Sequence, residues 1–369
     1  MKIGLVSPDS LLRPGGIKNH ILSLKKIFEQ DGHQVKIIAP RLTNLEDYGL
    51  EVILLGGAAI VPSNAATGAL SLSLFDKEGP EDVLKRENFD ILHFHNPLAP
   101  FLSWQLLAVS NSVNVATFHA DIKSMRITRY SPFLWGILYQ RFLPKIKGLI
   151  AVSKVARDSV LPYFKRKINI IPNGVDLAVF NQKNKPIKKY KDGKINILYV
   201  GRLEERKGVD FLLSAWKILK AKNLRLILVG DGPEKGKIER MVKEFNFKEV
   251  VLEGYVKDEN LPAYYATADV FCSPAIKGES FGMVLLEAMA SGVAIVAAAN
   301  DGYKEILKEA GKECLAKTED VNDLVIKLKR LIKDENLRKK LGEWGRWEAE
   351  KYSWDKIGSQ VLEFYQRYL

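Results

Sequence analysis

Short apolar runs alternate with amphipathic stretches along most of the 369-residue chain, which is the pattern of parallel strands joined by crossover helices. In the first half, amphipathic helices are predicted over 17–30 and around 81–87. The strands are predicted at 2–7, 34–39, 51–55, 91–95, 113–118, 148–152 and 168–171. The pattern therefore predicts that the chain begins as an α/β fold.

A second series of the same kind follows a polar, lysine-rich connection at 181–194. Its strands are predicted at 195–200, 224–229, 250–252, 270–273 and 293–297. From residue 321 onward the pattern is helical, and the last segment, 354–369, is amphipathic, with apolar residues such as Ile357 and Val361 at helical spacing. Two such series, in a chain of this length, predict two α/β domains.

The composition is that of an ordinary globular protein, with 47% apolar and 27% charged residues. Only two cysteines occur, Cys272 and Cys314, which excludes a disulfide framework and favours a reducing compartment such as the cytoplasm. We expect no secretory signal, because the first residues contain only a short apolar run. Two stretches without charged residues, 52–75 and 91–120, are each interrupted by proline, so we expect no membrane span.

The positive charge is concentrated in one part of the chain. Lysine and arginine number 56 against 44 acidic residues, giving a net charge of +12, of which the segment 121–170 supplies +9. Aromatic residues, among them Tyr130 and Trp135, are interleaved with these cations, a mixture that suits an anionic membrane surface. A solvated basic face beside core aromatics is the alternative. No DNA- or RNA-binding motif is visible, so we expect no nucleic-acid partner.

Two loops are candidates for binding phosphate. Pro14-Gly15-Gly16 follows the first strand and opens a helix, whose free N–H groups and dipole attract anions, although glycines also serve plain turns. The dinucleotide fingerprint is absent, which disfavours a nicotinamide enzyme. The second loop carries Arg202 and Lys207 between a strand and a helix, where two cations either neutralise a diphosphate or form surface charge.

Acidic and histidine residues provide further candidates. Glu279 and Glu287 are eight positions apart around a predicted helix start, on the order of 12 Å at about 1.5 Å per helical residue, a span comparable to that from a sugar to a nucleotide's ribose. His119 ends a strand, where open α/β sheets place ligand contacts. We expect His93 and His95 to point to opposite faces of their strand, and therefore to share no metal.

Together these features resemble the retaining glycosyltransferases of the GT-B fold and GT4 type, also called group 1, and among them the phosphatidyl-myo-inositol mannosyltransferases. The resemblance covers essentially the whole chain. It rests on Pro14-Gly15-Gly16, 94–100, Phe118-His119, 171–176, Gly201-Arg202, Lys207-Gly208, 230–233 and the Glu-x7-Glu motif that runs from Glu279 to Glu287.

The resemblance implies two Rossmann-like domains facing a cleft. The acceptor-binding domain would span 1–172, with a returning helix at 354–369, and the nucleotide-sugar-binding domain 173–353. Implied catalytic residues are His119, Arg202, Lys207 and Glu279. Implied donor-binding residues are Gly15, Gly16, Arg202, Lys207, Val256, Asp258, Glu279, Ser280, Phe281, Gly282 and Glu287. Acceptor-side candidates are Asp9, Lys18, Asn64, Lys123 and Arg126.

Within this set, the resemblance gives each group a role. Arg202, Lys207 and the Gly16 backbone would hold the diphosphate, and Glu279 the hexose hydroxyls. Glu287 would bind the ribose, His119 the transferred hexose, and Val256 and Asp258 the base.

The implied activity is transfer of a hexose, mannose from GDP-mannose, to a lipid-linked acceptor such as phosphatidyl-myo-inositol at the cytoplasmic membrane face. No cofactor or metal is expected, and the chain contains no Asp-x-Asp sequence of the metal-dependent architecture. Two departures, a loop at 64–71 without arginine and Ala120 after His119, leave the acceptor open. The alternatives are a UDP-sugar-dependent transferase with another acceptor, a sugar-nucleotide epimerase, and a non-catalytic binding module.

Overall fold

The chain forms two compact units, which the computed structural model defines as Met1–Asn173 with Trp354–Leu369, and Gly174–Ser353. The residues that the structure describes are 1–12, 15–41, 52–63, 66–71, 79–99, 102–119, 143–162, 164, 166–219 and 223–369. The sequence analysis had set the boundary between residues 172 and 173. Pro14, Asn64, Ala120, Lys123, Arg126 and most of the basic aromatic segment lie outside the described residues.

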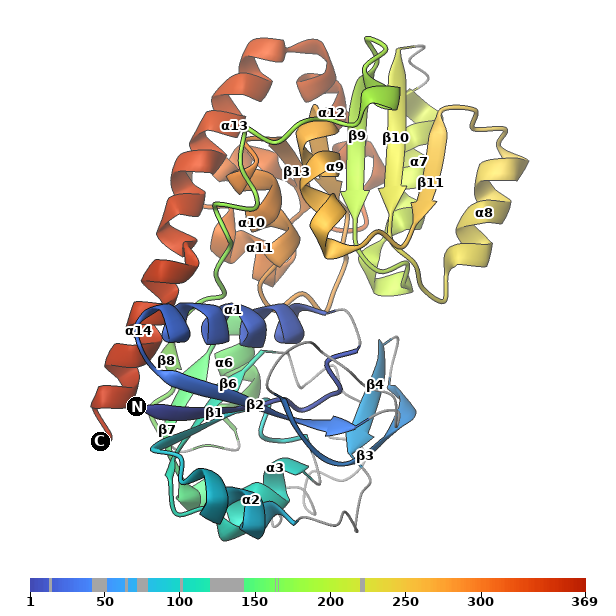
Figure 1. Ribbon diagram of the computed structural model, residues 1–369. Helices are drawn as coiled ribbons and strands as arrows, with labels where there is room; N and C mark the ends of the chain where they lie inside the picture. The colour runs from blue at the N-terminus through green and yellow to red at the C-terminus, as the bar shows by residue number, and fades with distance from the viewer. Residues whose placement is uncertain are drawn as a thin grey trace. The chain divides into compact units, whose positions relative to one another are not determined.

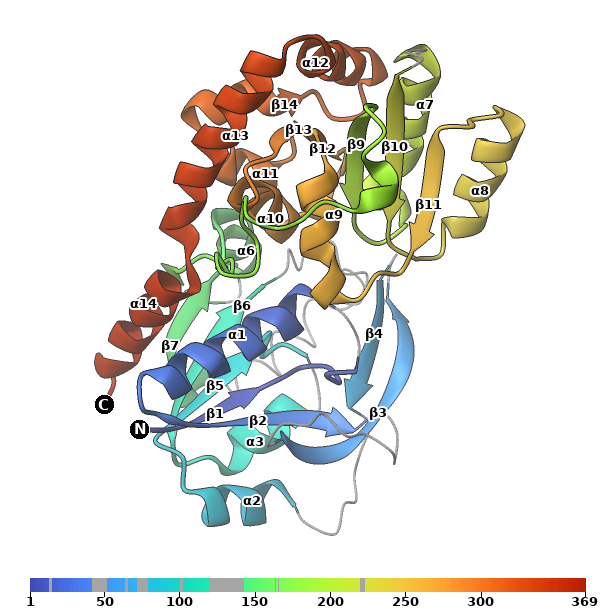
Figure 2. The same ribbon diagram turned by 45° about the horizontal axis from the view of Figure 1, so that its top comes forward.

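The first unit is built on a sheet in which the strands run in the order β4-β3-β2-β1-β5-β6-β7-β8. Its strands are β1 (Lys2–Val6), β2 (Gln34–Arg41), β3 (Val52–Ser63), β4 (Ala66–Ser71), β5 (Ile91–His95), β6 (Val113–Phe118), β7 (Ile146–Ala151) and β8 (Asn169–Ile170). The described pairings are parallel except that of β3 with β4. Figure 2 shows the β3–β4 pair at one edge of this sheet. The strand order reverses between β1 and β5, so ligand contacts are expected at their carboxyl ends.

The helices of the first unit include α1 (Gly16–Gln30), α2 (Pro80–Glu87), α3 (Leu102–Val109) and α6 (Lys154–Val160). The final helix, α14 (Trp354–Gln366), lies beside α1 (Figure 1). Ile357, Val361 and Phe364 of α14 join Ile21 and Phe28 of α1 in one buried apolar cluster. The last helix is therefore part of the core of the first unit, as the resemblance had implied.

The second unit has a sheet in the order β11-β10-β9-β12-β13-β14, and all of its described pairings are parallel. Its strands are β9 (Ile195–Val200), β10 (Leu224–Val229), β11 (Val250–Gly254), β12 (Val270–Ser273), β13 (Ala294–Ala298) and β14 (Leu315–Ala316). Its α-helices are α7 (Val209–Leu219), α8 (Lys235–Glu244), α9 (Leu261–Thr267), α10 (Met283–Ala290), α11 (Asp301–Ile306), α12 (Val321–Lys333) and α13 (Glu335–Ala349). Here the order reverses between β9 and β12.

The predicted α/β class and parallel strands are confirmed, with some ends shifted by a few residues. The prediction missed β4 and β14 and ended the third strand early, since β3 continues to Ser63. Both cysteines are buried and unbridged, as expected. None of the helices in the described ranges combines the length and apolar character needed to cross a bilayer.

Candidate active site

In the second unit, three loops meet at the carboxyl ends of β9, β10 and β12. A Cβ atom on Gly230 would lie 1.9 Å from the carbonyl oxygen of Gly201, and one on Gly208 would lie 2.4 Å from that of Pro274. Gly208 also has a φ of 66°, in the left-handed region that favours glycine. The glycines that accompany Arg202 and Lys207 therefore allow these loops to approach closely.

The loop after β9 carries a network of ion pairs. Nζ of Lys207 lies 2.7 Å from Oε1 of Glu279, and Nη1 of Arg206 donates to the same oxygen at 2.8 Å. Glu204 pairs through Oε1 with Nε of Arg202 and through Oε2 with Nε of Arg206, both at 2.9 Å. The structure thus brings together three of the predicted residues, Arg202, Lys207 and Glu279, and adds Glu204 and Arg206.

Glu204 and Arg206 are not among the residues predicted from the sequence. They stand in the run Glu204-Glu205-Arg206-Lys207, in which mixed charge reads as solvated surface. The run instead forms a 3₁₀ turn, η4 (Glu205–Lys207), that turns Glu204 inward and leaves Glu205 exposed. The one feature of the sequence that could have indicated a functional role for this run is its position just after a buried strand.

The Glu279–Gly282 loop is fixed by its packing against α11. A Cβ on Gly302 would lie 2.3 Å from the carbonyl oxygen of Glu279, and one on Gly282 would lie 2.7 Å from the ring of Tyr303. Gly282 has a φ of 112°, and Phe281 is buried beside it. Ser280 lies between Glu279 and Phe281, in the loop that leads into α10.

Glu287, the second carboxylate of the motif, lies on α10. The hydroxyl of Tyr265 donates to its Oε2 at 2.7 Å. Burial raises the pKa of Glu287 to about 7, and the charge of Asp258 acts in the same direction, whereas the Tyr265 hydrogen bond lowers the pKa. Asp258 begins η5 (Asp258–Asn260), two residues after Val256, so the predicted base-side residues follow β11.

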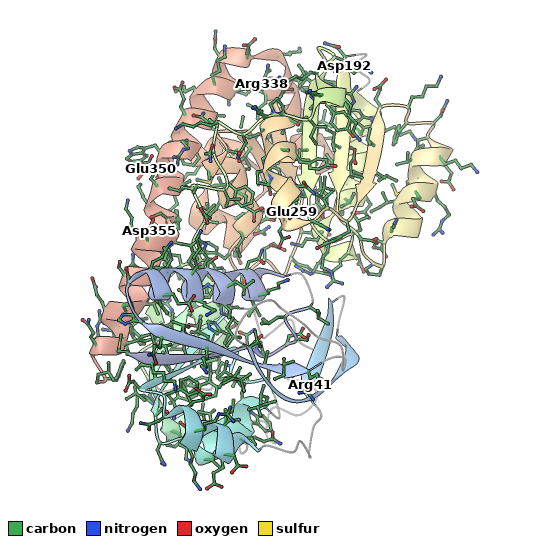
Figure 3. All side chains as sticks on the ribbon, viewed as in Figure 1. Arg41, Asp192, Glu259, Arg338, Glu350 and Asp355 are labelled. Atoms are coloured by element: carbon green, nitrogen blue, oxygen red, sulfur yellow. The ribbon has the colours of Figure 1, made fainter. Side chains whose placement is uncertain are left out.

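Figure 3 places Asp192, the partner of Arg225, at the opposite end of the same sheet, before β9 starts. That pair holds the lysine-rich connection to the sheet. It is not part of the network at the carboxyl ends.

In the first unit, His119 follows β6 and belongs to a buried cluster of imidazoles. Nδ1 of His95 and Nε2 of His119 are 2.9 Å apart. The ring of His20, from α1, packs edge-on against His119 with centroids 4.6 Å apart, and Nδ1 of His20 donates to Oδ1 of Asn173 at 2.8 Å. Burial lowers the pKa of His20 to about 4 and that of His119 well below its usual value, so both are neutral near pH 7.

The prediction that His93 and His95 point to opposite faces is wrong. Their rings stack with centroids 4.4 Å apart, because residues two apart on a strand share a face. Both ring nitrogens of His93 have hydrogen-bond partners: Nδ1 lies 2.6 Å from the hydroxyl of Tyr365, and Nε2 lies 2.6 Å from Oγ1 of Thr117.

Nothing in the sequence pattern predicts that His20, His95 and His119 lie together. One nitrogen of each lies within 4.8 Å of the others, a set that could hold a metal ion. Two of these rings, those of His95 and His119, also lie within hydrogen-bonding distance of each other. The expectation that the protein needs no metal stays a prediction.

The remaining predicted residues of the first unit lie near the carboxyl end of β1. Asp9 accepts a hydrogen bond from the backbone N–H of Ser10 at 2.8 Å. Gly15 and Gly16 are exposed at the start of α1, and Lys18 is in its first turn. This helix start offers backbone N–H groups without a side-chain cap.

Two protein-family models match the chain, and together they cover most of it. Residues 14–179 match Glycosyltransferase Family 4, and residues 180–347 match Glycosyl transferases group 1. The chain is 31% identical to phosphatidyl-myo-inositol mannosyltransferase of Mycolicibacterium smegmatis over 99% of this chain and 94% of that protein. The namesake from Mycobacterium tuberculosis is 32% identical, over 99% and 97% of the two chains.

Solved structures agree on the fold. Sucrose-phosphate synthase from Thermosynechococcus elongatus superposes with a TM-score of 0.77 at 21% identity, over 99% of this chain and 98% of that one. Anabaena HepE in complex with UDP-glucose gives a TM-score of 0.76 at 17% identity, over 100% of both chains. The chain thus belongs to the family 4, group 1 glycosyltransferases, with their GT-B fold of two Rossmann-like domains.

Proposed function

We propose that this glycosyltransferase moves mannose from GDP-mannose to a lipid-linked acceptor such as phosphatidyl-myo-inositol, at the cytoplasmic face of the membrane. The observation that carries the proposal is full-length similarity to proteins named for that acceptor and sugar. The ion-pair network after β9 supports it, since a departing nucleoside diphosphate needs nearby cations.

In the proposed reaction, Arg202 and Lys207 neutralise the charge that develops on the leaving diphosphate. Glu279, held by Arg206 and Lys207, accepts hydrogen bonds from hexose hydroxyls. Glu287 in its ionised form accepts from the ribose. His119 is neutral, so it exchanges hydrogen bonds with the hexose without supplying a charge.

For the first unit, we assign the start of α1, at Gly15 and Gly16, to the β-phosphate. Asp9 and Lys18 stay acceptor-side candidates, together with Asn64, Lys123 and Arg126. The net +9 of segment 121–170 supports attraction to anionic lipid headgroups, which salt would screen.

The test is transfer of the labelled sugar of each donor into lipid, with vesicles of phosphatidylcholine that contain phosphatidylinositol. We expect label in the lipid fraction when the labelled donor is GDP-mannose, little when it is labelled UDP-glucose, and a rate that falls as salt is raised. Vesicles without phosphatidylinositol are the control. A preference for a UDP-sugar would overturn the donor, and conversion of the donor without acceptor would indicate an epimerase.

A further inference from the structure

Glu204 is a charged side chain placed in the interior of the second unit. Its side chain has 0% relative exposure, although it stands on a loop at the end of β9. Removing a carboxylate from water is costly unless cations compensate for it. Arg206 donates a hydrogen bond from Nε to Oε2 at 2.9 Å. Nε of Arg202 lies at ion-pair distance, 2.9 Å from Oε1, although this oxygen accepts no hydrogen bond in the described residues.

Both arginines meet Glu204 through Nε, which leaves the outer Nη atoms for other partners. Nη1 of Arg206 donates to Oε1 of Glu279 at 2.8 Å and to the carbonyl oxygen of Gly278 at 3.3 Å. The Arg202 side chain is 42% exposed, and in the described residues its guanidinium makes no other ion pair. Glu204 therefore holds one edge of the Arg206 guanidinium by a hydrogen bond, attracts the Arg202 guanidinium at ion-pair distance, and leaves the Arg202 side chain partly exposed to solvent.

The backbone of this loop is held independently of the Glu204 carboxylate. The N–H of Leu203 donates to the carbonyl oxygen of Asp231 at 2.9 Å, and that of Ile276 donates to the carbonyl of Arg206 at 2.9 Å. A shorter acid at position 204 is therefore expected to leave the loop in place and to release the guanidinium groups.

We infer that Glu204 is a positioning residue for the donor diphosphate: it aims the Arg202 fork at the phosphates and, through Arg206, fixes the Glu279 carboxylate. The inference rests on the proposed use of a nucleoside-diphosphate sugar, whichever base it carries. Arginine binds phosphate through a planar fork, so its orientation matters more than that of a lysine ammonium.

The test is the preference for nucleoside diphosphate over monophosphate, measured as the ratio of dissociation constants for GMP and GDP, and for UMP and UDP. Glu204→Asp keeps the charge and withdraws the carboxylate by one methylene. We expect the ratio to fall about tenfold, the equivalent of 1.4 kcal/mol. The exposed neighbour provides the control, since Glu205→Asp should leave the ratio unchanged. A general structural defect would weaken both nucleotides equally.

A double-mutant cycle with Arg202→Ala tests whether Glu204→Asp changes the ratio of dissociation constants through Arg202. If Glu204 acts by aiming Arg202, Glu204→Asp should change the ratio much less when Arg202 is absent. Additive effects, or an unchanged ratio in Glu204→Asp, would overturn the inference. If the wild type binds neither GDP nor UDP, the proposed function itself fails, a result distinct from a diphosphate preference that is insensitive to position 204.

Discussion

The two carboxylates of the Glu-x7-Glu motif have different surroundings. Glu279 is paired with Arg206 and Lys207. Glu287 has a phenol as its hydrogen-bond partner, and burial brings its pKa to about 7. If Glu287 binds the ribose in its ionised form, as we propose, donor binding will therefore depend on pH near neutrality.

Replacing Tyr265 tests this at the residue scale. The Tyr265 hydrogen bond favours the ionised carboxylate, so Tyr265→Phe raises the pKa of Glu287 further. In the wild type, affinity for GDP should fall as the pH drops below about 7. In the variant this fall should begin at higher pH, with a loss of affinity at pH 7 of about fivefold, which corresponds to the roughly 1 kcal/mol of one hydrogen bond. Calorimetric titrations with GDP between pH 5.5 and 9 measure both profiles.

The adjacent tyrosine is the matched control. Tyr264 donates to Glu253 at 2.9 Å and not to Glu287, so Tyr264→Phe should keep the wild-type pH profile. A Tyr265→Phe profile that superposes on that of the wild type would show that Glu287 does not govern donor binding.

The functional residues that could be predicted from the sequence lie next to glycines in loops or at the ends of predicted strands. Arg202, Lys207, Glu279 and His119 are of this kind. Glu204, Arg206 and His20 were missed, because their importance depends on which way a turn or helix directs their side chains. In a sequence, oppositely charged residues one or two positions apart form the same pattern whether their side chains are exposed to solvent or buried, so the pattern does not predict burial.

At the scale of elements, α14 is held to α1 by a close approach. A Cβ atom on Gly358 would lie 2.6 Å from Cγ2 of Ile27, and one on Gly148 would lie 2.6 Å from the ring of Phe364. Small residues at these two positions let the last helix pack into the first unit.

Gly358→Ala should therefore destabilise the first unit, although alanine favours helix over glycine. The overpacked contact is expected to cost about 1–3 kcal/mol, measured as a lower urea midpoint. Gly236, in α8, is the control, since its nearest contact would be the end of Arg240 at 3.8 Å. Gly236→Ala should raise the free energy of unfolding by up to about 1 kcal/mol, and with it the urea midpoint. If both substitutions raise stability, the contact between α1 and α14 is looser than the structure indicates.

The elements themselves could largely be predicted, because buried parallel strands form continuous apolar runs between turn residues. The strands at Ile195–Val200 and Leu224–Val229 match the predicted bounds. The antiparallel pair of β3 and β4 was missed, since its glycine- and alanine-rich sequence does not alternate between apolar and polar residues. The docking of α14 could not be derived from its amphipathic pattern, which does not specify a partner; the family resemblance supplied it.

At the scale of the whole molecule, the chain leaves its first compact unit after Asn173 and rejoins it at Trp354. Each unit has a strand order that reverses once, and most of the described predicted residues lie beyond the carboxyl ends of strands, after β1 and β6 in the first unit and after β9, β11 and β12 in the second. The donor base, the hexose and the acceptor depend on side-chain detail that periodicity does not encode.

The most direct test of this account is the turnover of mannose transfer to phosphatidylinositol at saturating GDP-mannose, compared between the wild type and Glu279→Gln. We predict that the wild type forms mannosylated lipid and that Glu279→Gln lowers kcat about 100-fold, on the order of 2.7 kcal/mol of transition-state stabilisation. Glu239→Gln, an exposed change on α8, should stay within about twofold of the wild type. Full activity of Glu279→Gln would contradict the assigned site.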